Sequence, residues 1–133
     1  MKKMVIGFIA LVCVGLSIGG CASTKEKRMG LLNKTLQAYY TSMRWESFEG
    51  TRAFVRPDLR ENGPAQTQAV KLVSYDVIMG PAMIGDNQAV QAVQIRYYKT
   101  TNPRESNLID RQTWEYDAEK GHWWLTSKTP DFK

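Results

Sequence analysis

The side chains of this chain that could take part in chemistry are few and dispersed along it. Carboxylates and histidine serve as general acids and bases; the only histidine is His122, and Asp76, Asp110 and Glu115 stand within apolar stretches. One histidine and scattered carboxylates do not form a metal-ligand cluster. The serines lack the context of a catalytic nucleophile, and isolated glycines make no phosphate loop. We therefore expect no metal site and no cofactor.

The first twenty residues have the three-part layout of a secretory signal peptide. Lys2 and Lys3 give a positive start, residues 4–16 are uncharged and mostly apolar, and residues 17–20 are mostly small. A permanent membrane span needs about 20 apolar residues, so this run is short for one. We expect residues 1–20 to be removed on export.

The tetrad Ile18-Gly19-Gly20-Cys21 resembles the lipobox of bacterial lipoproteins, which has an aliphatic residue, two small residues and a cysteine. In that family the cysteine is diacylated and the signal is cut just before it, so the resemblance implies that Cys21 carries a lipid. Cys13 lies within the signal, and the mature chain then has no free thiol and no disulfide. The alternative is an ordinary signal peptide in which Cys21 is incidental.

Residues 22–28 follow as a short polar tether, which reaches at most about 25 Å when fully extended. Lys25, Lys27 and Arg28 would favour anionic lipid headgroups by about 1 kcal/mol each, unless the segment is simply a solvated linker. In Gram-negative lipoproteins an aspartate after the cysteine usually retains the protein at the inner membrane. Ala22 stands there instead, so the resemblance implies the outer membrane, facing the periplasm.

Residues 29–133 have the length of one ordinary domain. The formal charge of the whole chain is +5 and falls to +3 without Lys2 and Lys3. The remaining positive charges form no basic block, so nucleic acid is not indicated as a partner. With no disulfide, the domain depends on an aromatic-rich apolar core.

Two helices are predicted in the first part of this domain. Apolar residues recur at three- and four-residue steps from Met29 to Met43, which is typical of an amphipathic helix. A second, shorter helix is expected over about 47–55, with Ser47 as its N-cap. Pro57 limits it from behind, and residues 61–64 form a loop.

Four strands are predicted after the helices, over 69–79, 88–99, 108–116 and 122–127. In the first, we expect Val73, Tyr75, Val77 and Met79 to share one face and Ser74 and Asp76 the other. Gly80-Pro81 interrupts the first strand, and residues 85–87 and 100–106 are predicted turns. A hairpin loop over 117–121 would place Trp114 and Tyr116 on one face with Trp123 and Leu125, as part of the core.

Helices followed by strands indicate an α+β domain, with N-terminal helices packed on a curved, mostly antiparallel sheet of about four strands. At this level the chain resembles the nuclear transport factor two superfamily, also called cystatin-like, over about residues 29–132. The resemblance depends on the helix order, on Phe54-Val55-Arg56-Pro57 at the close of the second helix, and on the final hairpin around Trp114 and Trp123. No strand is evident between the second helix and Gly63-Pro64, where fuller members have one.

The superfamily holds both enzymes and non-catalytic binding domains, so the fold does not choose the function. Its enzymes use a carboxylate or a His-Asp pair inside the cone, which implies Asp76 as a general base or a catalytic role for His122. The alternatives are an aspartate on the open sheet face and a histidine placed by its turn. Tyr40, Tyr75, Arg96 and Trp114 are the residues we expect at a ligand pocket.

Because no set of catalytic residues converges, we expect a membrane-anchored, non-catalytic module that binds a small ligand, a peptide or an envelope protein, its own copy included. The alternative is a cofactor-free enzyme of the isomerase or dehydratase type that uses Asp76 as its general base.

Overall fold

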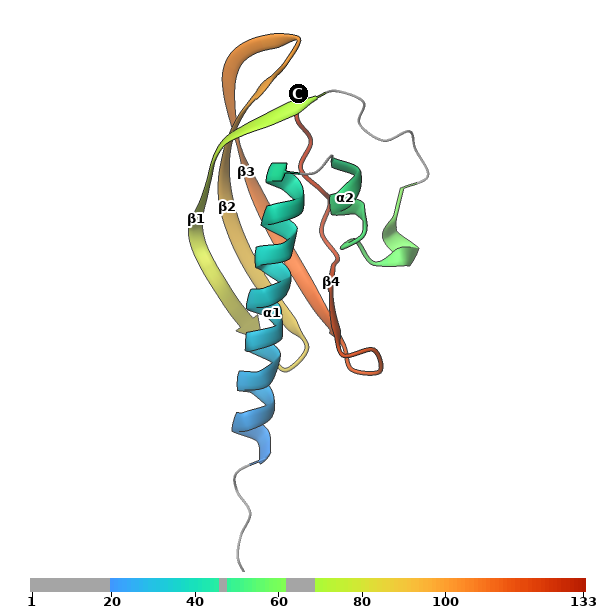
Figure 1. The fold of residues 1–133 in the computed structure, drawn as a ribbon. Coiled ribbons are helices and arrows are strands. Elements are labelled where there is room, and N and C mark those ends of the chain that lie inside the picture. Colours follow the sequence, from blue (N-terminus) through green and yellow to red (C-terminus); the bar gives the residue numbers. More distant parts are fainter. Residues whose placement is uncertain (1–19, 46–47, 62–68) are drawn as a thin grey trace, which may run out of the picture.

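The computed structural model describes residues 20–45, 48–61 and 69–133. Its first element is a single long helix, α1 (Gly20–Trp45), which runs along the length of the molecule (Figure 1). α2 (Phe48–Arg52) and a short 3₁₀ helix, η1 (Pro57–Leu59), follow it. The predicted helix over residues 29–43 is confirmed. The predicted second helix is shorter than expected, and its proposed cap Ser47 lies outside the described residues.

The segment expected to be a short polar tether, residues 22–28, belongs to the first part of α1. It contains alanine, lysine, glutamate and arginine, which favour helix, and neither glycine nor proline. At 1.5 Å per residue the seven steps from Cys21 to Arg28 span about 10 Å rather than the limit of about 25 Å for extended chain. The lipidation candidate is therefore joined to the domain through helix.

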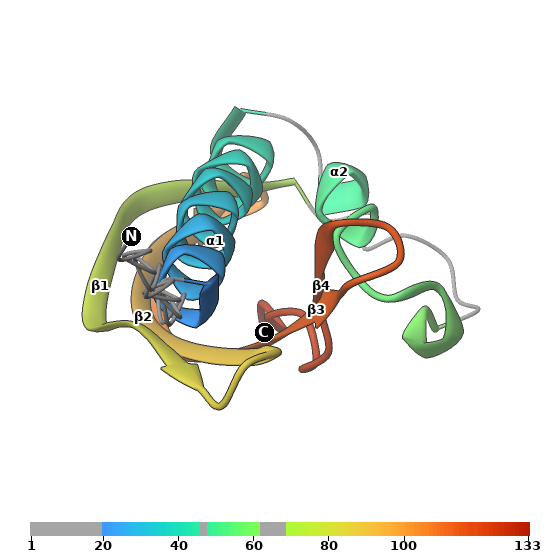
Figure 2. The ribbon, with the colours of Figure 1, turned by 90° about the horizontal axis from the view of Figure 1, so that it is seen from below.

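Four antiparallel strands form one sheet in the order β1-β2-β3-β4, which confirms the predicted α+β architecture. The strands are β1 (Val70–Ile84), β2 (Gln88–Lys99), β3 (Asn102–Asp117) and β4 (His122–Leu125). Figure 2 shows that the sheet curls around α1, with β1 and β2 on one side of the helix. We call the face of the sheet toward α1 the inner face and the opposite one the outer face.

β1 departs most from its prediction, because it continues through Gly80-Pro81 to Ile84. Its register with β2 shifts in three places, between Leu72 and Ser74 and twice from Val77 to Ala82. Such bulges break the alternation of faces, and an edge strand tolerates a proline that cannot donate to a neighbour. The register confirms part of the predicted pattern: Tyr75 and Val77 pair with the inner-face residues Ile95 and Val93, and Ser74 and Asp76 lie on the other face. The prediction is wrong for Met79, which pairs with Ala92 after a shift and so leaves the face of Tyr75.

Two turns between strands contain a glycine at the position where the backbone is left-handed. Gly85 and Gly121 both have positive φ, 64° and 61°, which favours glycine. The loop before Gly121 is closed by Asp117, whose carboxylate accepts the backbone N–H groups of Glu119 and Lys120 at 3.1 Å. The turn expected over residues 100–106 is tighter, since β3 already begins at Asn102.

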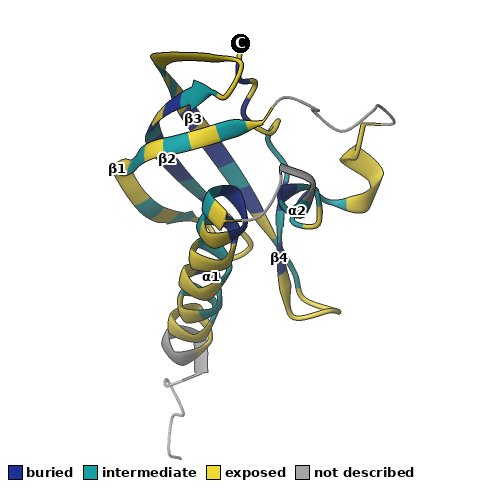
Figure 3. Ribbon diagram, turned by 45° about the horizontal axis from the view of Figure 1, so that its top comes forward, coloured by how far each residue is buried: buried dark blue, intermediate teal, exposed yellow. Residues whose placement is uncertain are grey.

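The core lies between α1 and the inner face, as the burial colours of Figure 3 show. The predicted cluster in the last hairpin is confirmed: Trp114 pairs with Leu125 and Tyr116 with Trp123, and all but the half-buried Tyr116 are completely buried. Tyr39 of α1 packs edge-to-face against Trp114, with ring centroids 5.4 Å apart. The free edge of β4 is covered by a parallel bridge between Val55 and Leu125.

Candidate functional site

A cluster of polar side chains is buried on the inner face, beneath α1. The register of β2 and β3 places Gln91 opposite Gln112 and Val93 opposite Asp110. Asp110 is only 5% exposed, Gln91 4% and Gln112 1%. Polar groups buried to this degree cost free energy unless they bond to one another.

Gln112 lies at the centre of this cluster and bonds to each of its neighbours. Its amide Nε2 donates to Asp110 Oδ2 at 2.7 Å and to the Tyr75 hydroxyl at 3.0 Å. Its Oε1 accepts from Gln91 Nε2 at 3.3 Å and from Trp114 Nε1 at 3.2 Å. Both ends of one amide thus organise the polar groups of three strands.

Burial shifts the proton equilibria of the acidic groups in the cluster. Loss of hydration raises the pKa of Asp110 to about 6, against the opposite effect of its bond from Gln112. Burial also raises the pKa of Tyr75 to about 12 and the pKa of Tyr39 well above its ordinary value, with the nearby Asp110 contributing to both. These are the kinds of shift found at catalytic sites, although Asp110 and Gln112 are almost completely shielded from solvent.

The sequence pattern contained a signal for this cluster. Asp110 was among the candidate carboxylates, and counting back by twos from the core residue Trp114 gives Gln112 and Asp110 on the same face. The same count from the buried Ile95 gives Gln91 on β2. Sequence reasoning named neither glutamine, because a glutamine carries no chemistry that draws attention on its own.

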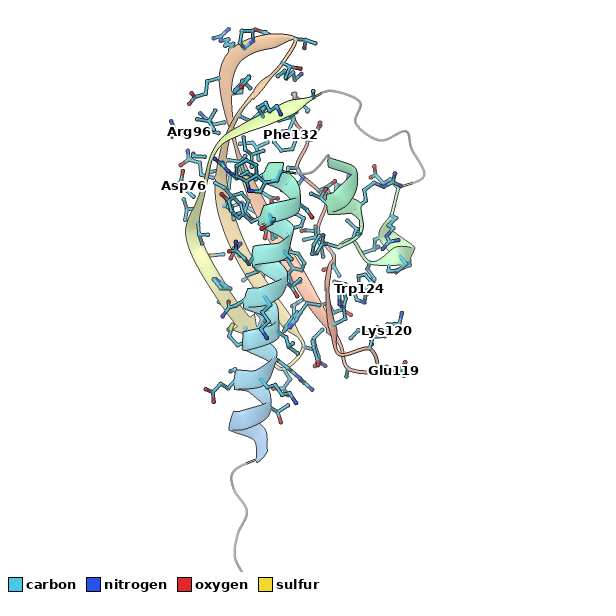
Figure 4. The ribbon with its side chains drawn as sticks, in the orientation of Figure 1. Asp76, Arg96, Glu119, Lys120, Trp124 and Phe132 are labelled. Atoms are coloured by element: carbon cyan, nitrogen blue, oxygen red, sulfur yellow. The ribbon has the colours of Figure 1, made fainter. Side chains whose placement is uncertain are left out.

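Asp76 lies on the outer face, as expected for an aspartate on the open face of the sheet, and not in the cone, where the alternative of a general base would place it. It is exposed, and Ser74 Oγ donates to its Oδ2 at 2.8 Å. Arg96 Nε donates to the same Ser74 oxygen at 2.9 Å, and Arg96 also pairs with Glu105 at 3.3 Å. Figure 4 shows Asp76 and Arg96 on the side of the sheet away from α1. This is a chain of surface contacts between neighbouring strands.

The four residues expected at a ligand pocket do not meet in one. Tyr40 and Tyr75 are in contact, with ring centroids 4.9 Å apart. Trp114 is fully buried in the core. Arg96 belongs to β2, and its side chain lies on the outer face, so the sheet separates it from the other three side chains.

A shallow groove does exist elsewhere, on the solvent side of α1 beside Phe54. Its volume is about 630 Å³, and none of the expected pocket residues lines it. Its lining is formed by Asn33, Lys34, Gln37, Ala38, Thr41, Ser42 and Phe54.

His122 begins β4 directly after the hairpin loop and is exposed. Its ring contacts Trp124, with centroids 4.3 Å apart, and the Lys120 ammonium lies 5.8 Å from the centroid of the same ring. Its backbone pairs with Asp117, and no other acid–base partner adjoins it in the contacts of the described residues. Residues 20–45, 48–61 and 69–133 also contain no group of three potential metal ligands.

Most of the large apolar side chains that are exposed in the described part of the chain lie along β1, on both faces of the strand. We call this set the β1 strip, and it consists of Val73, Val77, Ile78, Met79 and Ile84. Each of these side chains is between 38% and 54% exposed, and Ile109 of β3 adds a further 46%-exposed side chain on the outer face. β1 is also the edge of the sheet, with β2 as its only strand neighbour within the described residues.

Cys21 lies in the first turn of α1, and its side chain, like residues 1–19, is outside the described part of the chain. Of the helices in the described ranges, none combines the length and hydrophobicity needed to cross a bilayer.

The fold defines a class, an α+β domain with one long helix laid on an open antiparallel sheet, and the comparisons with known proteins add no narrower one. No protein-family model, curated protein or solved structure matches this chain. Membership of the nuclear transport factor two superfamily therefore stays a prediction.

Proposed function

We propose that this chain is a lipid-anchored envelope protein whose domain binds another protein through its edge strand, without catalysis. The observation that carries the proposal is the β1 strip: a long edge strand that is apolar and exposed at once. Exposed apolar surface that is contiguous marks interaction sites. An unpaired strand edge supplies backbone donors and acceptors for a strand of the partner.

The inside of the domain supports a binding function over an enzymatic one. Its perturbed acid, Asp110, is 5% exposed and bonded to Gln112 beneath α1. The exposed carboxylate Asp76 bonds to a neighbouring serine on the outer face. A general base must reach the proton that it abstracts. Asp110 is too little exposed to do so, and Asp76 lies on the outer face, across the sheet from Tyr40, Tyr75 and Trp114.

The test of binding uses a photo-crosslinking amino acid in place of Ile78, in the full-length chain expressed in its own envelope. We expect a discrete crosslinked species, lost when Val77→Asp is added, because a charge desolvated at the interface is unfavourable. The matched control carries the crosslinker in place of Lys128, an exposed residue beyond β4. Equal crosslinking at both positions, or crosslinking that Val77→Asp leaves intact, would contradict the proposal. The mass of the species distinguishes a second copy from another protein.

Anchoring is proposed at Cys21, with the outer membrane's periplasmic face as the address implied by Ala22. The Cys21→Ala chain should lose metabolic labelling by fatty acid and remain uncleaved or unanchored. Labelling that persists in the variant would show that Cys21 is not the lipidated residue. Membrane fractionation of the parent chain then tests the address.

A further inference from the structure

One end of the domain is fixed rigidly to the part of α1 that carries Cys21. We call it the anchor end, and it consists of residues 24–28 of α1, the turn 85–87 and the loop 117–121. The two loops adjoin, since the backbone N–H of Tyr116 donates to Asn87 O at 2.7 Å. Figure 1 shows the N-terminal part of α1 and both turns toward the same end of the molecule, opposite the turn between β2 and β3.

Arg28 is where α1 becomes fixed to this end. Its Nη1 donates to the backbone carbonyl of Asp86 and to Asn87 Oδ1, both at 2.9 Å. Its guanidinium lies 4.8 Å from the ring centroid of Tyr116. Its own backbone carbonyl accepts from Trp123 Nε1 at 3.0 Å. These contacts join one helical residue to the β1–β2 turn, to β3 and to β4.

The distance from this attachment to the anchoring residue is short. Cys21 and Arg28 belong to one uninterrupted helix, and the seven helical steps between them span about 10 Å. A helix of that length has no flexible joint of its own, so it restricts the orientation of the domain at the bilayer more than an extended linker would. The short helical segment from Cys21 to Arg28, and its attachment at Arg28, therefore determine which end of the domain faces the bilayer.

We infer that the anchor end faces the bilayer and rests at its lipid headgroups, with the opposite end, the turn Thr100–Thr101, directed away from the membrane. The inference depends on the lipidation of Cys21 proposed above. β2 separates the two ends by about 40 Å at 3.3 Å per residue. The β1 strip then extends outward from the membrane surface, where a partner standing in the periplasm can reach it.

Charge attraction is not what produces this orientation. The cations of the anchor end are Lys25, Lys27, Arg28 and Lys120. Its acids are Glu26, Asp86, Asp117 and Glu119. The two sets balance, and the guanidinium of Arg28 already bonds within the domain. We therefore expect the helix to set the orientation independently of lipid charge, and not the attraction of Lys25, Lys27 and Arg28 to anionic lipid.

The test measures depth with one fluorophore at each end of the lipidated chain. Glu119→Cys and Thr101→Cys place single thiols in exposed loops, because the mature chain offers no other free thiol (Figure 4 labels Glu119). Each labelled protein is reconstituted into phosphatidylcholine vesicles with a spin-labelled lipid as quencher. We expect strong quenching at residue 119 and none at residue 101, unchanged when phosphatidylglycerol is added. Equal quenching at the two sites, or a difference that requires phosphatidylglycerol, would overturn the inference.

A second variant tests the role of the helix. A flexible Gly-Ser-Gly-Gly insertion between Lys25 and Glu26 should remove the difference between the two labels while the protein stays vesicle-bound. A difference that survives the insertion would show that α1 does not set the orientation. Failure of the parent chain to carry lipid or to bind vesicles would instead refute the proposed anchoring, and the two failures are thus distinguishable.

Discussion

The inner face of the sheet buries polar side chains, whereas the β1 strip exposes apolar ones. Beneath α1 the glutamines and Asp110 are buried and satisfy one another through Gln112. On β1 the side chains of valine, isoleucine and methionine remain exposed. A buried polar network is costly unless it is complete, and exposed apolar groups contribute little to folding. The side chains of the inner face thus stabilise the fold, whereas those of the β1 strip remain accessible to a partner.

The largest effect should come from emptying the core on the inner face. Trp114→Ala removes a fully buried indole that packs on Tyr39 and donates to Gln112. We expect the free energy of unfolding to fall by about 3–5 kcal/mol in urea denaturation. The matched control is Ile109→Ala on the outer face of the same strand, with an expected loss below about 1 kcal/mol. Comparable losses in both would mean that the two faces do not differ as described.

The next effect concerns the charge within the buried cluster. Because the pKa of Asp110 is about 6 when folded, above its ordinary 3.8, the folded state holds the proton more tightly than the unfolded state. Stability should therefore fall as the pH rises from about 4 to 6 and stay lower above 6. Asp110→Asn keeps an acceptor for Gln112 and should be more stable by about 2–3 kcal/mol at pH 7.

Unfolding curves at pH 4 and pH 7 check this expectation, since parent and Asp110→Asn should converge at the lower pH. Gln112→Glu serves as the opposing variant. It adds a second acid beside Asp110, so the free energy of unfolding should fall more steeply as the pH rises. An Asp110→Asn chain that is less stable than the parent at pH 7 would show that the ionised carboxylate is favoured by its surroundings.

The sequence predicted the fold closely where one face of an element is buried throughout. The pairing of Asp117 with His122, and the cluster of Trp114 and Trp123, follow from regular alternation and one turn glycine. Prediction failed on β1, because bulges interrupt its alternation and the faces of Val73 and Met79 cannot be counted across them.

The candidate site was less accessible to sequence reasoning than the fold. Asp76 and Asp110 are both aspartates on strands with apolar neighbours. Counting by twos from Trp114 places Asp110 on the inner face, whereas bulges interrupt the count along β1 and the face of Asp76 follows from its register with β2. Gln112 matters through its four bonds, which no local pattern contains. The beginning of α1 at Gly20 was missed because residues 22–28 carry no apolar residues at helical spacing, although their helix propensities favour helix.

The strip should contribute much less to folding than the inner face. Met79→Ser removes an apolar side chain that is 46% exposed, and we expect the free energy of unfolding to change by less than about 1 kcal/mol. The same variant should weaken crosslinking through Ile78, as measured under the conditions that keep the parent folded. A large loss of stability would place Met79 in the core and remove the strip as a binding surface.

The smallest effect is expected for Asp76→Asn, on the outer face. The carboxylate is exposed and accepts one bond from Ser74, and asparagine can accept the same bond through its carbonyl oxygen. The free energy of unfolding should remain within about 0.5 kcal/mol of the parent at pH 7. Partner crosslinking through Ile78 should also persist, because the charge lies beside the strip and not within it. A strong loss of crosslinking with unchanged stability would extend the binding surface from the apolar strip to the polar contacts that join Asp76, Ser74 and Arg96.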